Sequence, residues 1–105
     1  MALRPPYAEY VKYAMRAYIA AEANWDPTKA TSGSRAEQDN WLSCRRALQR
    51  FEGPEQTLLF EVYGKYDTMP DNVYQAAAAR RMAQDDVWAL INRFETEFAK
   101  IRGLI

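Results

Sequence analysis

Apolar residues recur every three or four positions along most of this 105-residue chain, which is the period of an α-helix. Glycine and proline interrupt the pattern between successive segments, as they do between helices. No segment alternates apolar and polar residues over the length that a strand requires. A chain of this length forms one hydrophobic core. The pattern therefore predicts an all-α fold, a single-domain bundle of about five helices.

The N-terminal half, residues 1–50, is predicted to form a pair of helices. The first follows two adjacent prolines and continues to about Asn24. Residues 25–34 have the composition of a loop and are expected to be the most mobile part of the chain. Ser34 and Glu37 then match a capping box, which places the start of the second helix. Its buried stripe is predicted to consist of Trp41, Cys44, Leu48 and Phe51.

The C-terminal half, residues 51–105, is predicted to contain three further helices. The third helix begins after a glycine–proline pair and ends at Gly64. A turn over residues 65–70 follows, after which Asp71 and Asn72 are both able to cap the fourth helix. The residues expected to face the core are Leu58, Leu59, Val62 and Tyr63 in the third helix and Val73, Tyr74, Ala77 and Met82 in or after the fourth.

The fifth helix carries the clearest apolar pattern in the chain. Asp85 is placed to cap it after a break at Ala83 and Gln84, and Gly103 is placed to end it. Two basic residues in its last turn suit the negative end of the helix dipole. Its core-facing residues are predicted to be Val87, Leu90, Ile91, Phe94, Phe98 and Ile101.

Residues 77–90 follow the pattern of a helix-turn-helix motif. Small residues allow the two helices to approach, Met82 is expected to plug the turn, and Val87 helps to anchor the second helix. Residues 54–63 look like the helix that leads into this motif in the fourth region of bacterial sigma-70-type factors. The chain therefore resembles that region over about residues 51–104.

The resemblance implies that the second helix of the motif lies in the major groove of promoter DNA. Arg80 and Arg81 would then lie near phosphates. Arg81 stands where the turn of that family usually has glycine, and Asp85 and Asp86 replace residues that are often serine, threonine or arginine. Lys100 extends the exposed polar face of the same helix. The residues predicted to contact DNA are Arg80, Arg81, Gln84, Trp88, Ala89, Asn92, Arg93 and Lys100.

The formal net charge is zero, from 14 basic and 14 acidic side chains, so no overall positive field attracts a polyanion. Residues 1–52 hold eight basic and six acidic side chains, and residues 53–105 hold six and eight. DNA binding therefore requires that cations gather in a local patch. The side chains available to build it include Arg45, Arg46 and Arg50 of the second helix together with Arg80 and Arg81.

Few residues are available for enzymatic chemistry. The chain has no histidine and one cysteine, which excludes the usual zinc sites, a histidine-dependent triad and an internal disulfide. Cys44 lies on an apolar stripe, where a free cysteine usually behaves as a small buried hydrophobe, and a catalytic thiol there is a weaker third hypothesis. No glycine-rich phosphate loop is present. We therefore expect a protein that is not an enzyme and has neither metal nor cofactor.

The sequence shows neither a signal-peptide core near its start nor an apolar run of roughly 20 residues, so we expect a cytoplasmic protein with no membrane partner. Our leading hypothesis is a small DNA-binding or transcription-associated accessory protein whose partner is double-stranded DNA or the transcription machinery. The alternative is a helical protein–protein interaction module or homodimer without nucleic-acid contact. Tyr13, Ile19 and Trp88, which lie off the main apolar faces, favour that alternative.

Overall fold

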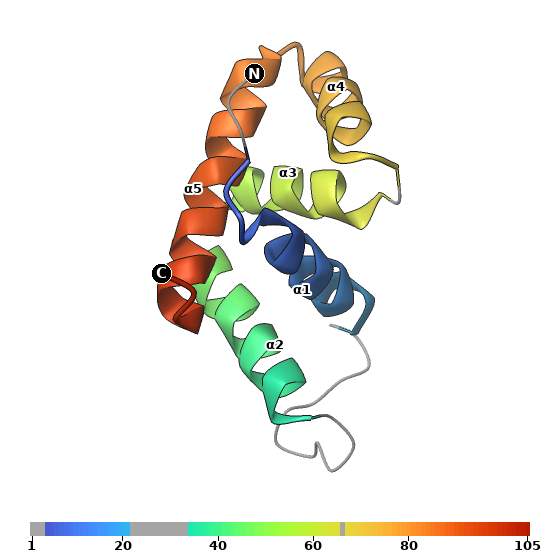
Figure 1. Ribbon diagram of the computed structural model, residues 1–105. Helices are drawn as coiled ribbons and strands as arrows, with labels where there is room; N and C mark the ends of the chain where they lie inside the picture. Colours follow the sequence, from blue (N-terminus) through green and yellow to red (C-terminus); the bar gives the residue numbers. More distant parts are fainter. Residues whose placement is uncertain (1–3, 22–33, 66) are drawn as a thin grey trace.

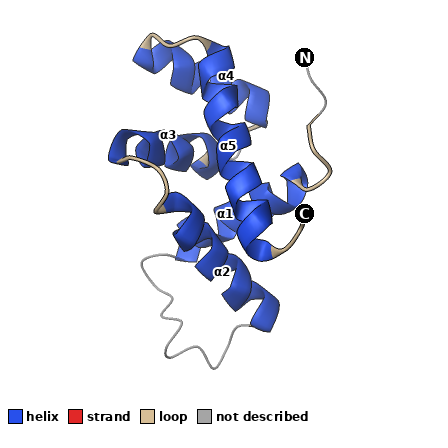
Figure 2. Ribbon diagram, turned by 90° about the vertical axis from the view of Figure 1, so that its left-hand side faces the viewer, coloured by secondary structure: helices blue, strands red, loops and turns tan. Residues whose placement is uncertain are grey.

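The computed structural model describes residues 4–21, 34–65 and 67–105, which form five helices (Figure 1). The described residues contain no strand (Figure 2). The prediction of an all-α bundle of five helices is confirmed. The helices are, in chain order, α1 (Ala8–Ala21), α2 (Arg35–Leu48), α3 (Gly53–Gly64), α4 (Met69–Arg80) and α5 (Gln84–Arg102).

Helix α5 is the longest and organises the molecule. It has 19 residues, runs along one side of a body of 43 × 28 × 24 Å, and contacts all four other helices (Figure 1). Helix α4 lies beside its N-terminal end, α2 lies beside its C-terminal half, and α3 crosses between them. Five of the six residues predicted for its inner face are buried, and the sixth, Ile101, is half-buried. One connected core therefore joins the helices.

Helix α2 begins as predicted. The side-chain oxygen of Ser34 accepts a hydrogen bond from the backbone amide of Glu37 at 3.2 Å, so one of the amides left without a partner at the helix start is satisfied. The predicted end of the first helix at Asn24, and the predicted loop as far as residue 33, lie outside the described residues. The stripe of Trp41, Cys44, Leu48 and Phe51 is buried, with Phe51 in the turn that follows the helix.

The start of α4 differs from the prediction. Thr68 caps the helix, and its Oγ1 accepts a hydrogen bond from the backbone amide of Asp71 at 3.3 Å. The prediction that Asp71 and Asn72 cap α4 is wrong because Pro70 belongs to the first turn of the helix rather than to the preceding loop. Proline is tolerated there because the amides of a first turn have no partner within the helix. The helix therefore begins at Met69.

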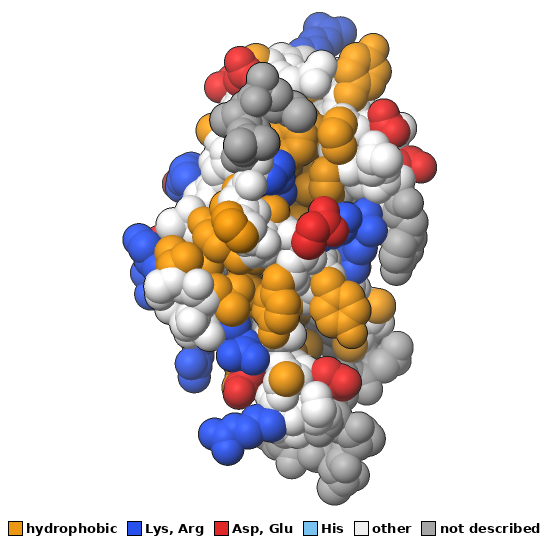
Figure 3. Space-filling view, in the orientation of Figure 1, with side chains coloured by type: hydrophobic (Ala, Val, Ile, Leu, Met, Phe, Trp, Pro, Cys, Tyr) orange, Lys and Arg blue, Asp and Glu red, His pale blue; other side chains and the backbone are white. Residues whose placement is uncertain are grey.

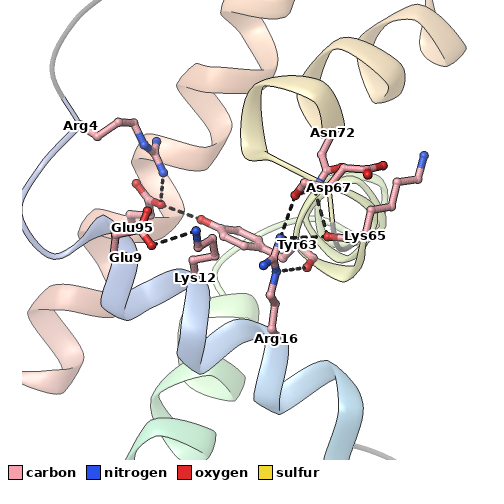
Figure 4. A network of polar contacts seen from close by, with 9 residues as sticks. All are labelled: Arg4, Glu9, Lys12, Arg16, Tyr63, Lys65, Asp67, Asn72 and Glu95. Carbon is pink, nitrogen blue, oxygen red and sulfur yellow. Dashed lines mark hydrogen bonds and ion pairs between the residues drawn. The ribbon is translucent and has the colours of Figure 1, made fainter.

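The C-terminal end of α3 is held by side chains from two other helices (Figure 4). Asn72 of α4 is buried, and its Nδ2 donates to the carbonyl oxygens of Val62 at 2.9 Å and Lys65 at 3.1 Å. The guanidinium of Arg16 in α1 donates to the carbonyl oxygens of Tyr63 at 3.2 Å and Lys65 at 3.0 Å. These bonds satisfy carbonyls that a helix end leaves without partners, so they fix α1, α3 and α4 relative to one another.

The start of α5 also differs from the prediction. The helix begins at Gln84, with Ala83 as its cap residue and Asp85 inside its first turn. The carbonyl oxygen of Ala83 accepts a hydrogen bond from the amide of Asp86 at 3.1 Å. No side chain caps the start of the helix, because alanine has no polar group. Asp85 and Asp86 still suit this end because it is the positive end of the helix dipole. Gly103 ends the helix as predicted, with φ of +80°.

Two residues predicted to face the core do not lie in it. Tyr74 of α4 is 62% exposed, and Met82 in the turn after α4 is 36% exposed. The amide of Met82 caps α4 by donating to the carbonyl oxygen of Ala77 at 2.9 Å, and its side chain lines a surface hollow with Leu58 and Leu90. The prediction that Met82 plugs the turn is therefore wrong.

Candidate nucleic-acid interface on α5

The turn between α4 and α5, residues 81–83, has a distinctive backbone conformation. Arg81 has φ of 54° and ψ of 41°, in the left-handed region. Its amide donates to the carbonyl oxygen of Ala78 at 3.3 Å, and the next amide, of Met82, bonds to Ala77 as described above. This pair of bonds is the Schellman arrangement, in which glycine usually occupies the left-handed position. Arg81 therefore occupies a conformation that favours glycine.

The predicted DNA-contacting side chains of α5 form two neighbouring rows, because residues four positions apart lie above one another on a helix. Five of the six are exposed, and Trp88 is half-buried. Lysine and arginine side chains recur along the left-hand edge of the molecule, where α5 lies, and apolar side chains occupy much of the centre (Figure 3). The first row consists of Gln84, Trp88, Asn92 and Lys100, and the second contains Ala89 and Arg93.

Arg4, from the segment that precedes α1, lies on the first row. Its guanidinium is 4.9 Å from the centre of the Trp88 ring and donates to Oδ1 of Asn92 at 3.3 Å. The same guanidinium forms an ion pair with Oε2 of Glu95 at 2.5 Å. Arg4 lies 91 positions before Glu95, so no local sequence pattern indicates these contacts. Arg4 is thus an intramolecular partner of two predicted DNA-contacting residues, Trp88 and Asn92.

Glu95 anchors Arg4 from inside the protein (Figure 4). Its side chain is fully buried, and its Oε2 also accepts a hydrogen bond from the hydroxyl of Tyr63 at 2.8 Å. Its other oxygen, Oε1, has no hydrogen-bond partner among the described residues. Burial raises the pKa of Glu95, against the opposing effects of Arg4 and the Tyr63 hydroxyl. Burial and the nearby Glu95 charge raise the pKa of Tyr63 well above its usual value.

Arg93, in the second row, is fixed by contacts with the corner between α2 and α3. Its guanidinium lies 5.2 Å from the centre of the Phe51 ring and forms an ion pair with Glu55 at 3.3 Å. Beside it, Arg50 forms an ion pair with Glu97 of α5 at 3.3 Å. Arg50 and Arg93 line one surface hollow. The structure therefore places a cation from the end of α2 next to the predicted contact face of α5.

The other arginines are distributed differently. Arg80 is ion-paired with Glu61 of α3 and shares with Arg93 a second hollow beside the α4–α5 turn. Arg81 is exposed at the turn itself. Arg45 lies 5.3 Å from the centre of the Trp41 ring and lines a different hollow, between α2 and α3. Arg50 thus contacts α5, whereas the contacts of Arg45 lie on another side of α2.

Several other chemical features bear on function. Cys44 is fully buried, and burial raises the pKa of its thiol to about 12, so the reactive thiolate is strongly disfavoured at neutral pH.

The described residues contain no group of three acidic, histidine or cysteine side chains that could hold a metal ion. Within the same residues, no helix is long and apolar enough to cross a membrane.

The comparisons with known proteins found no protein-family model, no curated protein and no solved structure that matches this chain. The exposed residues of α5 combine amide and guanidinium groups in the middle of the helix with two aspartates in its first turn.

Proposed function

We propose that this protein binds double-stranded DNA through α4, the 81–83 turn and α5, as a small transcription-associated accessory protein that is not an enzyme. The proposal rests on the conformation and length of the turn between α4 and α5. Arg81 has the left-handed conformation at the position where the sigma-like motif usually has glycine, and three residues separate the end of α4 from the start of α5. A turn of three or four residues joins the two helices of a helix-turn-helix, whose second helix enters the major groove, so the length of this turn supports the proposal.

The side chains on the exposed part of α5 suit such a role. Asparagine and glutamine pair with the edge of adenine, and arginine pairs with that of guanine, so Gln84, Asn92 and Arg93 are the side chains suited to base contacts. Arg81 and Lys100 are exposed cations suited to phosphates. The aspartates of the first turn oppose phosphate contact at that end. We therefore place the main contact at the middle of α5.

The ion pair of Arg93 does not prevent DNA contact. Its side chain is 62% exposed and that of Glu55 is 30% exposed, and ion pairs of such exposure contribute only about 0.2–1 kcal/mol. A phosphate or a guanine edge offers the guanidinium a bidentate partner in place of the carboxylate. Because the net charge of the chain is zero, most of the attraction to DNA must come from local contacts in which a phosphate takes the place of a carboxylate. The affinity for DNA should therefore depend strongly on salt.

The proposal is tested by titrating the full chain against labelled random-sequence duplex DNA and measuring fluorescence polarisation at about 50 and about 200 mM salt. We expect binding that weakens at the higher salt concentration, and an affinity about 10- to 100-fold lower for Arg93→Glu. Arg45→Glu is the matched control, since it makes the same charge change away from α5, and it should have a far smaller effect. Absence of binding by the unaltered protein at the lower salt concentration would overturn the proposal.

A second candidate function is a protein–protein interaction module, such as a homodimer. It is favoured by two exposed aromatic side chains, Tyr13 of α1 at 67% and Tyr74 of α4 at 62%, and by the apolar centre of the face in Figure 3. Light scattering distinguishes the two functions. A stable dimer whose interface covers Trp88 and Asn92 leaves no free helix face for a DNA groove, whereas a monomer that binds DNA excludes this candidate.

A further inference from the structure

The hollow between the α2–α3 corner and the middle of α5 has a volume of about 430 Å³, and its walls are polar and apolar in nearly equal parts. Arg50 lines it from the turn that follows α2, and Arg93 lines it from α5. Asn92 and Thr96 belong to its α5 wall. Phe51 is buried to all but 7% and forms a fixed apolar surface below the guanidinium of Arg93. Two cations from distant parts of the chain therefore converge on one concave surface.

Both cations remain accessible although each has a carboxylate partner. The side chains of Arg50 and Arg93 are 61% and 62% exposed, and their ion pairs with Glu97 and Glu55 have N–O distances of 3.3 Å. Strong charge-assisted bonds between these groups are shorter, at about 2.7–2.9 Å. Stacking on Phe51 holds the face of the Arg93 guanidinium and leaves its edge available. A phosphate can therefore replace either carboxylate at little cost.

We propose that this hollow binds a backbone phosphate of the DNA duplex, with Arg50 as a DNA-contacting residue in addition to those that the sigma-like resemblance assigns. This inference rests on the proposed function, because Asn92 and Arg93 on its wall are the side chains suited to base contacts there. Phosphate is the favoured occupant because the guanidinium groups of Arg50 and Arg93 offer several N–H donors to its oxygens. The N-terminal half thus contributes to the interface through its last residue.

Glu97 then has a defined effect on affinity. In the free protein its carboxylate neutralises Arg50, and in the complex it would lie near the bound phosphate and repel it. Glu97→Gln keeps the shape of the side chain and removes the negative charge. We therefore expect Glu97→Gln to raise DNA affinity, by about two- to fivefold at about 50 mM salt, and Arg50→Ala to lower it.

The experiment measures DNA affinity by polarisation for Arg50→Ala, Arg50→Lys and Arg45→Ala over about 50–200 mM salt. Arg50→Ala should weaken binding about 3- to 10-fold and reduce the slope of log affinity against log salt by about 1, as expected for one lost phosphate contact. Arg50→Lys retains the charge and should keep most of the slope. Arg45→Ala, the matched control on another face, should change neither quantity.

The outcomes separate this inference from the proposed function. Equal effects of Arg50→Ala and Arg45→Ala, with Arg93→Glu still strongly defective, would overturn the phosphate site and leave the α5 interface in place. If inorganic phosphate at millimolar concentration competes with the duplex, the ligand of the hollow is free phosphate and not the duplex backbone. This result would also overturn the inference. Failure of the unaltered protein to bind DNA would overturn both. A thermal melt of each variant followed by circular dichroism establishes that it is folded.

Discussion

The surroundings of Glu95 are unusual for a glutamate, because its side chain is fully buried. A fully buried carboxylate is costly unless a cation and hydrogen bonds compensate for the water it loses. Here Arg4 and the Tyr63 hydroxyl both bind Oε2, while Oε1 lacks a hydrogen-bond partner among the described residues. Arg4 is 29% exposed, so this residue joins a buried charge to the protein surface beside Asn92.

The Arg4–Glu95 pair predicts a pH-dependent effect of Arg4→Ala on stability. At pH 7 the substitution leaves Glu95 without its cation and should lower the free energy of unfolding by about 1–3 kcal/mol. Burial raises the pKa of Glu95 in the folded state. In Arg4→Ala the unpaired carboxyl of Glu95 therefore binds a proton at a higher pH than other carboxyls do. The difference between variant and parent should therefore shrink as the pH falls through the pKa of Glu95. Urea unfolding of variant and parent at pH 7, and at a second pH below the pKa of Glu95, measures this difference.

A double-mutant cycle supplies the control for this prediction. Arg4→Ala should have little effect in a Glu95→Gln background, because the buried charge is then absent. Tyr63 and Glu9 are the other titratable groups that act on Glu95, and neither substitution removes them. A loss of stability that is the same at both pH values, or the same in both backgrounds, would show that Arg4 acts through packing against Trp88 instead.

The ends of the helices depend on backbone conformation as much as on side chains. Two helices end in the left-handed conformation, α4 at Arg81 and α5 at Gly103. The conformation is readily available to glycine and costs other residues about 1–2 kcal/mol. Arg81 retains this costly conformation because the bonds from its own amide and that of Met82 close the end of α4.

Substitutions at these two helix ends should have opposite effects. Arg81→Gly should raise the free energy of unfolding by about 0.5–1 kcal/mol, since it removes the conformational cost, and Gly103→Ala should lower it by about 1 kcal/mol. No atom lies within 4 Å of the position that a Cβ at Gly103 would occupy, so the second effect is conformational rather than steric. Chemical denaturation measures both. Arg81→Ala is the control, and a gain equal to that of Arg81→Gly would assign the effect to the side chain instead.

At the scale of the whole molecule, the two halves of the chain share one core. The C-terminal half of α5 packs against α2, and Phe98 and Ala99 in that half are fully buried. The side-chain oxygen of Asn40 in α2 accepts hydrogen bonds from the Arg102 guanidinium at 2.7 Å and from the Tyr10 hydroxyl at 2.9 Å. Residues 51–105 are therefore part of a larger bundle.

This shared core predicts that residues 51–105 do not fold alone. Removing α1 and α2 exposes the apolar surface of α5 around Phe98 and also leaves Glu95 without Arg4. We expect the isolated fragment to show no cooperative thermal transition by circular dichroism, whereas the full chain shows one. A fragment that unfolds cooperatively near the melting temperature of the full chain would contradict this.

The sequence by itself determined the features that arise from neighbouring residues. The helical period predicted five helices and most of their buried faces, Ser34 marked the start of α2, and Gly103 marked the end of α5. These features were predictable because hydrogen bonds and side-chain contacts within a helix join residues three or four positions apart. The caps of α4 and α5 were predicted wrongly because several neighbouring residues were able to cap, and their relative energies depend on small differences in backbone conformation.

Only the tertiary structure decided which charges meet. The zero net charge and the arginines near α2 and α5 left open whether any cations gather, because the pattern assigns a side chain to a helix face but does not say which helix lies opposite. Packing of α1 and α2 against α5 brings Arg4 to Asn92 and Arg50 to the hollow beside Arg93, and packing of α3 against α4 brings Glu61 to Arg80. Such pairings join residues distant in the chain, and the crossing of packed helices creates them.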